Sequence, residues 1–114
     1  MLRTFQALKA TSDFRRTQLS FVRTLEDLEL VREIGFHQAA GRPTTLQLLF
    51  LKNYGTLATI QRRLNRLKRL GVIDYTKSIH DKRVVHLTLS QDVWERHVRL
   101  GKLMRKIWGN GARL

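Results

Sequence analysis

The chain has 114 residues, of which 42% are hydrophobic, and carries a formal net charge of +13. A single domain of this length buries about two-thirds of its unfolded surface, so the composition excludes a disordered chain. The absence of cysteine excludes disulfides, thiol nucleophiles and cysteine-based metal sites, and no apolar run approaches the roughly 18 residues of a membrane span.

The positive charge is concentrated in the second half of the chain. Residues 1–51 hold seven Lys or Arg against five Asp or Glu, whereas residues 52–114 hold fifteen against four. A charge imbalance of this size carries information about which partners a protein binds, but not about its fold. The sequence therefore predicts that the second half contacts a polyanion such as nucleic acid.

The first segment, residues 1–19, is basic and rich in Ser and Thr, and its one acid is Asp13. Mitochondrial transit peptides share these features, and so do loosely held basic arms. A third interpretation is a short helix that packs Phe5, Leu8 and Leu19 on a neighbour. We expect a basic arm or a short helix, and the lack of a continuous apolar centre excludes a secretory signal.

A helical pattern follows over residues 20–40. Its apolar face consists of Val22, Leu25, Leu28, Val31 and Ile34. Thr24 precedes Glu26 and Asp27, which places carboxylates in the first turn, where the helix dipole favours them. Because this is the one acidic segment of the chain, we expect it to be scaffold that does not face nucleic acid.

A second, shorter helix is predicted over residues 46–52. Gly41 and Pro43 interrupt the preceding pattern, and either Thr44 or Thr45 can cap the new helix. Residues 53–55 form the turn after it. A tight turn containing glycine between two helices predicts a helix-turn-helix arrangement.

The segment 56–70 predicts the helix around which the domain is built. Its apolar stripe consists of Leu57, Ile60, Leu64 and Leu67, and its opposite face holds Thr59, Arg62, Arg63, Arg66 and, at the edge, Arg69. The stretch contains no acid to relieve the repulsion between these arginines. Guanidinium groups gathered in this way suit phosphates or base edges. The alternative is an ordinary amphipathic helix with a solvated basic face.

Two strands and a basic tip follow this helix, which Gly71 ends. Residues 72–75 and 84–89 are rich in β-forming side chains, and the polar segment 77–83 joins them. A hairpin directly after the third helix is the wing of a winged helix. Lys77, Lys82 and Arg83 at its tip suit the negative potential of a minor groove, with Asp81 placed to orient them. The alternative is an ordinary charged turn.

Three stretches, GRPTTLQLL, GTLATIQRRLNRLKRLGVI and DKRVVHLTLS, resemble the helix-turn-helix and wing of MarR-type transcriptional regulators. The matching positions are Ala58 and Thr59, Leu67 with Gly71 and Val72, Asp81 with Arg83, and Leu87 with Thr88. The resemblance covers roughly residues 24–90. It implies that Arg83 enters the minor groove and that Asp81 forms an ion pair with an arginine of the recognition helix. Residues 1–23 and 91–114 are shorter than the family's dimerising helices, which argues against a small-molecule effector.

A C-terminal amphipathic helix is predicted over residues 90–108, with Ser90 as its cap and Asp92 in the first turn. Its apolar side can pack on the protein itself or on a second copy. The candidate dimerisation residues are Trp94, Val98, Met104, Ile107 and Trp108. The basic side of the same helix can instead touch flanking phosphates.

No enzyme motif is present: the sequence has no glycine-rich phosphate loop, no zinc-type His-Glu pair and no nucleophile elbow. The four histidines are His37, His80, His86 and His97, at spacings that suit no simple metal site. We therefore expect no catalytic residue, no metal and no cofactor.

The sequence as a whole predicts a mostly α protein with a small β-hairpin, a winged helix-turn-helix flanked by residues 1–19 and 90–114 around a core domain at 20–89. We expect a cytoplasmic, nucleoid-associated transcriptional regulator that binds double-stranded DNA as a homodimer, with the recognition helix in the major groove. The candidate contacts are Lys52, Thr56, Thr59, Gln61, Arg62, Arg63, Asn65, Arg66, Arg69, Lys77, Asp81, Lys82 and Arg83. The alternatives are a non-specific architectural or replication-associated DNA-binding protein, an RNA- or ribosome-associated domain, and a winged helix that binds an acidic protein.

Within that expectation the contacts have different roles. Arg62, Arg63 and Arg66 reach guanine edges or phosphates, and Thr59 reaches a thymine methyl group or a phosphate. Gln61 and Asn65 lie on the flank and read adenine if the helix is rotated. Lys52 and Thr56 fix the register on the DNA backbone.

Overall fold

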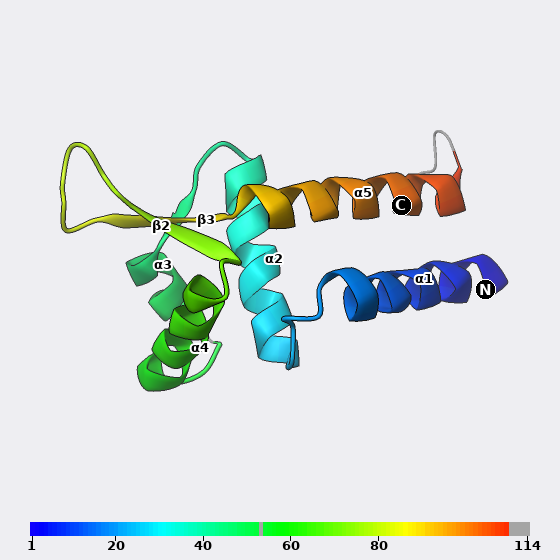
Figure 1. Cartoon of the computed structure of the whole chain (residues 1–114), viewed down its shortest axis with the longest axis horizontal. Coiled ribbons are helices and arrows are strands. Elements are labelled where there is room, and N and C mark those ends of the chain that lie inside the picture. The colour runs from blue at the N-terminus through cyan, green and yellow to red at the C-terminus, as the bar shows by residue number, and fades with distance from the viewer. Residues whose placement is uncertain (53, 110–114) are drawn as a thin grey trace. The chain divides into compact units, whose positions relative to one another are not determined.

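The computed structural model describes residues 1–52 and 54–109. Its elements in chain order are α1 (Leu2–Gln18), α2 (Leu25–Ala39), β1 (Thr44–Thr45), α3 (Leu46–Leu51), α4 (Leu57–Arg69), β2 (Ile73–Lys77), β3 (Val85–Leu89) and α5 (Gln91–Trp108) (Figure 1). They form two compact units, one of Phe21–Gln91 and one of Met1–Ser20 with the chain from Asp92 onward. The first is here called the central unit and the second the terminal unit.

The central unit contains three helices and a small sheet in the order of a winged helix-turn-helix, which confirms the predicted fold class. Its buried apolar side chains are Leu28, Leu30, Val31, Ile34, Leu49, Ile60, Leu64, Leu67, Val72, Ile73, Leu87 and Leu89. They come from α2, α3, α4 and the hairpin, so the leucine-rich faces of the helices meet at one core.

The N-terminus of α2 is fixed by a side-chain cap. Thr24 Oγ1 accepts a hydrogen bond from the backbone N–H of Asp27 at 3.1 Å. Ser and Thr side chains commonly cap helix N-termini in this way. The expected apolar face is wrong at two positions, because Val22 precedes the helix and Leu25 lies in its first turn and is 64% exposed. Leu30, which was not expected in the face, is fully buried. Gly35 allows a close approach farther along, since a Cβ there would lie 3.1 Å from Leu89 Cδ1.

The sheet has three antiparallel strands in the order β1-β3-β2. The hairpin register pairs Ile73 with Leu89 and Lys77 with Val85, and β1 pairs Thr44 with Leu87. Figure 1 shows the hairpin of β2 and β3 extending away from α2 and α4. This is the predicted wing, and its middle strand is also bonded to the two residues that lead into α3.

The helix-turn-helix is bounded by threonine caps and glycines, as predicted. Thr45 Oγ1 accepts from the N–H of Leu48 at the start of α3, and Thr56 Oγ1 accepts from the N–H of Thr59 at the start of α4. Gly71 has a φ of +75°, the left-handed conformation that commonly follows a helix C-terminus. These local signals place α4 within one residue of its predicted ends.

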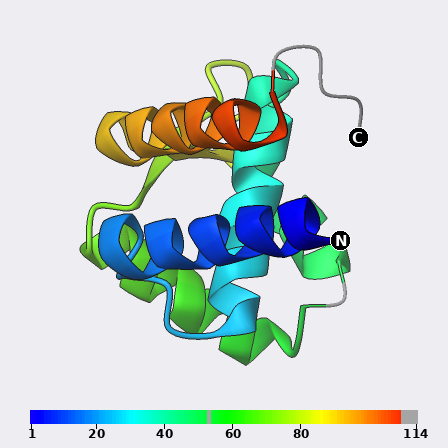
Figure 2. The ribbon, with the colours of Figure 1, turned by 90° about the vertical axis from the view of Figure 1, so that its right-hand side faces the viewer.

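The terminal unit consists of α1 and α5, which run side by side in opposite directions (Figures 1 and 2). Arg96 of α5 donates to the backbone carbonyl of Gln18 at 2.7 Å and pairs with Asp92 one turn earlier at 3.1 Å. Of the two expectations for residues 1–19, an arm or a short helix, the structure has the helix, α1, which has 17 residues. Among the described residues, no helix has the length and apolar character needed to cross a bilayer.

Candidate nucleic-acid interface

Helix α4 is anchored by one face and presents the other. Ile60, Leu64 and Leu67 are fully buried, at the spacing of three and four residues that gives a helix an apolar stripe. Leu57 was expected in the same stripe but is exposed, because it stands at the first helical position, before the contact with the core begins. The arginines therefore come from a helix whose position is fixed by buried leucine and isoleucine.

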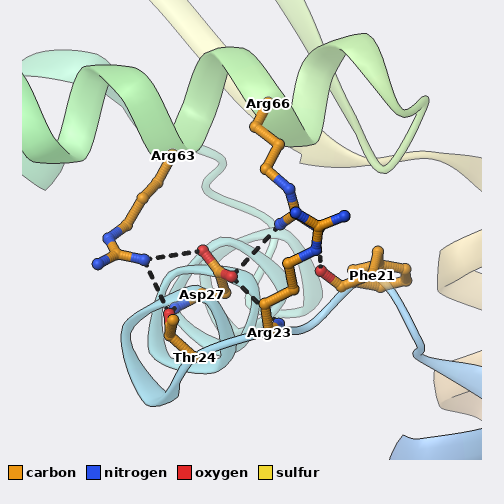
Figure 3. Close-up of polar contacts among 6 residues, drawn as sticks. All are labelled: Phe21, Arg23, Thr24, Asp27, Arg63 and Arg66. Atoms are coloured by element: carbon orange, nitrogen blue, oxygen red, sulfur yellow. Dashed lines mark hydrogen bonds and ion pairs between the residues drawn. The ribbon is translucent and has the colours of Figure 1, made fainter.

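Two of those arginines turn toward the protein. Arg63 Nη1 lies 3.4 Å from Asp27 Oδ1 and Arg66 Nη1 lies 3.3 Å from Asp27 Oδ2, and Figure 3 shows both side chains reaching from α4 to this carboxylate. Arg63 also donates to Thr24 Oγ1 at 2.8 Å and Arg66 to the carbonyl of Phe21 at 2.9 Å. Their side chains are 19% and 18% exposed. The prediction that both belong to an outward face with Arg62 is wrong in this respect.

The carboxylate that attracts them is buried and well supplied with donors. Asp27 is 2% exposed, and besides the two guanidinium groups it accepts from the backbone N–H of Arg23 at 3.2 Å. A buried carboxylate needs such partners, because transfer out of water is costly for an unpaired charge. Asp27 therefore joins α4 to the start of α2 and sets where Arg63 and Arg66 lie.

Fewer of the predicted DNA-contacting residues lie on the outward side of α4 than the sequence analysis expected. Arg62, Asn65 and Arg69 are exposed, and in the described residues the side chains of Arg62 and Arg69 make no hydrogen bond or ion pair. Gln61 donates from Nε2 to Asn65 Oδ1 at 2.9 Å, which aligns the two amides on one edge. This edge offers two guanidinium groups and two amides to a ligand.

The hydroxyl groups of Thr56 and Thr59 at the start of α4 are hydrogen-bonded within the helix. Thr56 Oγ1 donates to Thr59 Oγ1 at 2.9 Å while it caps the helix. Thr56 is exposed and Thr59 is partly buried. The two predicted threonine contacts thus lie together at the first turn, next to Gly55, whose φ of +131° is open to glycine and rarely to other residues.

An open groove runs between the start of α2 and α4. It has a volume of about 650 Å³ and is lined by Arg23, Thr24, Asp27, Ala58, Gln61, Arg62, Arg63, Asn65, Arg66 and Arg69. We call it the arginine groove. It holds five guanidinium groups and one carboxylate, so its charge is strongly positive, and the sequence analysis did not assign Arg23 to it.

The wing carries its charge on an ordered turn. Ser78 N–H donates to the carbonyl of Val84 and Val84 N–H to that of Asp81, both at 2.9 Å. Asp81 accepts three hydrogen bonds from Arg83, at the backbone N–H, Nε and Nη2. These bonds hold the pKa of Asp81 below its ordinary value. Lys77 and Lys82 are exposed on the same hairpin.

The expected ion pair between Asp81 and an arginine of the recognition helix is wrong. Asp81 pairs with Arg83, two residues away, because a turn of this kind brings them into bidentate range without any movement of α4. The Arg83 side chain remains 90% exposed. The orienting role proposed for Asp81 toward Arg83 agrees with this geometry.

Lys52 lies apart from this surface, in a cluster centred on Glu33 of α2. Glu33 accepts from His37 Nε2 at 2.7 Å and from the Tyr54 hydroxyl at 3.2 Å, and Lys52 Nζ lies 3.7 Å away. Burial raises the pKa of Glu33, but the hydrogen bonds from His37 and Tyr54 and the charges of His37 and Lys52 outweigh it and leave that pKa lowered. The cluster fixes the turn between α3 and α4 to α2.

Replacing Glu33 by Gln is expected to lower the melting temperature at neutral pH and to have less effect in acid. Because the native pKa of Glu33 is lowered from 4.5, its ionised form stabilises the fold above the unfolded pKa, and the contribution is lost as pH falls through the native pKa. Thermal unfolding followed from about pH 7 to about pH 3 measures this. Glu29→Gln, an exposed position on the same helix, is the control, and a wild-type advantage that persists undiminished at the acid end would contradict the assignment.

The candidate dimerisation residues lie along α5 in the terminal unit. Val98 and Met104 are exposed, while Trp94, Ile107 and Trp108 are partly buried. On α1, Leu2, Phe5 and Leu8 are also exposed. Within residues 1–52 and 54–109, no group of three or more His, Asp or Glu side chains is arranged to hold a metal ion.

Comparison with known proteins finds its matches among solved structures. No protein-family model matches the sequence, and no curated protein matches it. The structure of FabT from Streptococcus pneumoniae in complex with DNA is 24% identical, with a TM-score of 0.61, over 90% of this chain and 71% of that one. The structure of MarR is 17% identical, with a TM-score of 0.56, over 96% and 83%.

The transcriptional regulator Tm0710 of Thermotoga maritima is also similar, at 17% identity and a TM-score of 0.57, over 96% of this chain and 78% of that one. These matches extend over both the winged helix and the flanking helices. They confirm the resemblance predicted from the sequence motifs at the level of the fold. The chain has the winged helix-turn-helix fold of MarR-type transcriptional regulators.

Proposed function

We propose that this protein is a sequence-specific transcriptional regulator that binds double-stranded DNA and acts without catalytic chemistry. The observation that carries the proposal is the outward edge of α4, where Arg62 and Arg69 are exposed beside Gln61 and Asn65 on a helix held by three buried side chains. FabT, whose structure was determined in complex with DNA, has the same fold. A regulator of this kind would work in the cytoplasm at the nucleoid.

In this proposal α4 lies in the major groove, which is wide enough for a helix. Arg62 reads a guanine edge, and Arg69 contacts the groove edge or a phosphate. The Gln61 and Asn65 amides are suited to adenine. Arg63 and Arg66, held by Asp27, orient the helix rather than read bases.

The wing takes the adjacent minor groove. Arg83 extends from a turn stabilised by Asp81, and a narrow minor groove has the negative potential that attracts an inserted arginine. Lys77 and Lys82 add charge beside it. Contacts of this type position the protein on the duplex and favour A·T-rich flanks.

We propose further that two copies associate through the terminal unit. Val98 and Met104 on α5 and Phe5 on α1 leave apolar surface exposed in a single chain, and a second copy would cover it with Trp94, Ile107 and Trp108 alongside. A two-fold dimer places its two recognition helices about one turn of DNA apart. The operator is then a pseudo-palindrome.

Selection of bound duplexes from a random pool tests the function. The wild type is expected to enrich a two-fold-related site and to bind it at least about 10³-fold more tightly than bulk DNA. Arg62→Ala is expected to relax the preference at one base pair per half-site by about 1–3 kcal/mol. Arg32→Ala, an exposed arginine on α2 outside the arginine groove, is the matched control.

The selection also separates the alternatives. Tight binding with no enriched sequence would indicate an architectural DNA-binding protein. No binding to duplex DNA would leave the RNA-associated and protein-interaction alternatives. Enrichment of single half-sites would contradict the dimer. An Arg62→Ala variant that loses affinity equally for all sequences would reassign Arg62 to a phosphate.

A further inference from the structure

The arginine groove lies on one flank of α4, and its charge is not balanced by the protein. Five guanidinium groups line it, from Arg23, Arg62, Arg63, Arg66 and Arg69, against the single carboxylate of Asp27. The nearby acid Glu26 is exposed on the first turn of α2 and is not part of the lining. Asp27 is buried between Arg63 and Arg66, so its charge is committed to those two side chains.

The guanidinium groups also retain unused donors. Each carries five N–H groups, and Arg63 and Arg66 together make four hydrogen bonds. The Nε of Arg63 is buried without a hydrogen-bond partner in the described part of the chain. Asp27 and the backbone therefore leave N–H groups of this cluster without an acceptor from the described residues.

Arg23 completes the cluster from outside α4. It immediately precedes the cap of α2, and its backbone N–H is held by Asp27 Oδ2 at 3.2 Å. In Figure 3 its side chain extends toward that of Arg66, and in residues 1–52 and 54–109 no hydrogen bond or ion pair engages the Arg23 guanidinium. Like charges brought together in this way repel, and an anion between them relieves the repulsion.

We propose that the arginine groove binds a backbone phosphate of the duplex, with Arg23 as a phosphate-contacting residue contributed by the segment just before α2. This inference rests on the proposed function, because a helix lying in the major groove has a phosphate backbone on each flank. The groove shares Gln61, Arg62, Asn65 and Arg69 with the outward edge of α4. A duplex that meets that edge brings one strand over the groove, where planar guanidinium groups match the geometry of phosphate oxygens.

The contact has a measurable signature. Each phosphate neutralised by a cationic side chain contributes about 0.9 to the slope of log K against log salt concentration. Arg23→Gln is expected to reduce the magnitude of that slope by about 0.9 per subunit and to weaken binding to all duplex sequences alike. Arg32→Gln makes the same change of charge on α2, outside the groove, and is expected to leave the slope close to the wild-type value.

The experiment measures binding of wild type, Arg23→Gln and Arg32→Gln to one duplex over a series of salt concentrations, with melting temperatures taken in parallel. If the wild type does not bind duplex DNA, the proposed function fails and this inference with it. If the wild type binds but both variants keep the same slope, the groove contact is overturned while the function stands. If Arg23→Gln changes sequence preference instead of slope, Arg23 reads a base and the phosphate assignment is overturned.

Discussion

Replacing Asp27 by Asn is expected to lower the free energy of unfolding by about 2–4 kcal/mol, because removal of one partner leaves charges uncompensated. The amide keeps the size of the side chain but not its charge, so Arg63 and Arg66 lose the ion pairs that they make at 3.4 and 3.3 Å. Both arginine side chains are less than one-fifth exposed, so water compensates their charges only in part. The bond from the backbone N–H of Arg23 is weakened as well.

Chemical denaturation of wild type and Asp27→Asn at neutral pH measures this difference. Asp74→Asn is the matched control, because Asp74 is exposed on β2 and surface changes are usually within about 0.5 kcal/mol. If Asp27→Asn were as stable as the control, the ion pairs of Asp27 with Arg63 and Arg66 would not contribute to the stability of the fold. The internal placement of Arg63 and Arg66 would then need another cause.

Truncation of Leu64 to Ala is expected to destabilise the central unit by about 2–5 kcal/mol, the range observed for fully buried leucines. Leu64 is fully buried between Ile60 and Leu67 on the anchored face of α4. The loss combines the removed apolar contact with the cavity left behind, because the surrounding helices relax only partly. A small domain has roughly 5–15 kcal/mol of stability in total, so this change removes a large part of it.

The control for this change is Leu70, which caps the C-terminus of the same helix. Leu70→Ala removes the same atoms from a side chain that is 52% exposed, and it is expected to cost well under half as much. Equilibrium unfolding in urea gives both values, provided that the slope with denaturant is unchanged. Equal losses at the two positions would mean that α4 is not held by the face described above.

The helices and turns with local signals could be predicted from the sequence. The ends of α3 and α4 follow from Thr45, Thr56 and Gly71, whose capping roles depend only on residues within one turn. The stripe of Ile60, Leu64 and Leu67 depends only on the helical period. Because such features depend on neighbouring residues, their predicted positions are close to the observed ones.

The partners of the arginines could not be predicted in the same way. Asp27 lies 36 and 39 residues before Arg63 and Arg66, and no periodicity relates positions so far apart. The spacing from Thr24 to Asp27 is a capping pattern, yet a carboxylate in a first turn is usually interpreted through the helix dipole. Only the packing of α2 against α4 shows that this carboxylate is buried and faces two guanidinium groups.

One element was missed and another was left open between an arm and a helix, because their sequence signals are weak. α1 has no clear apolar stripe, so its 17 residues gave no reliable helical period. The two residues of β1, Thr44 and Thr45, could be interpreted as caps, and Thr45 is one. Their role as a strand depends on pairing with Leu87 and His86, more than 40 residues later.

The pairing of β1 with β3 has a consequence for how the protein meets its site. Because β3 is bonded on one side to β2 and on the other to the residues that open α3, the wing and the helix-turn-helix share a continuous backbone ladder. We expect this ladder to limit the movement of the base of the wing relative to the helix-turn-helix. If Arg62 and Arg83 contact DNA as proposed, we expect weaker binding to operators in which one or two base pairs are inserted between the segments that face these two side chains.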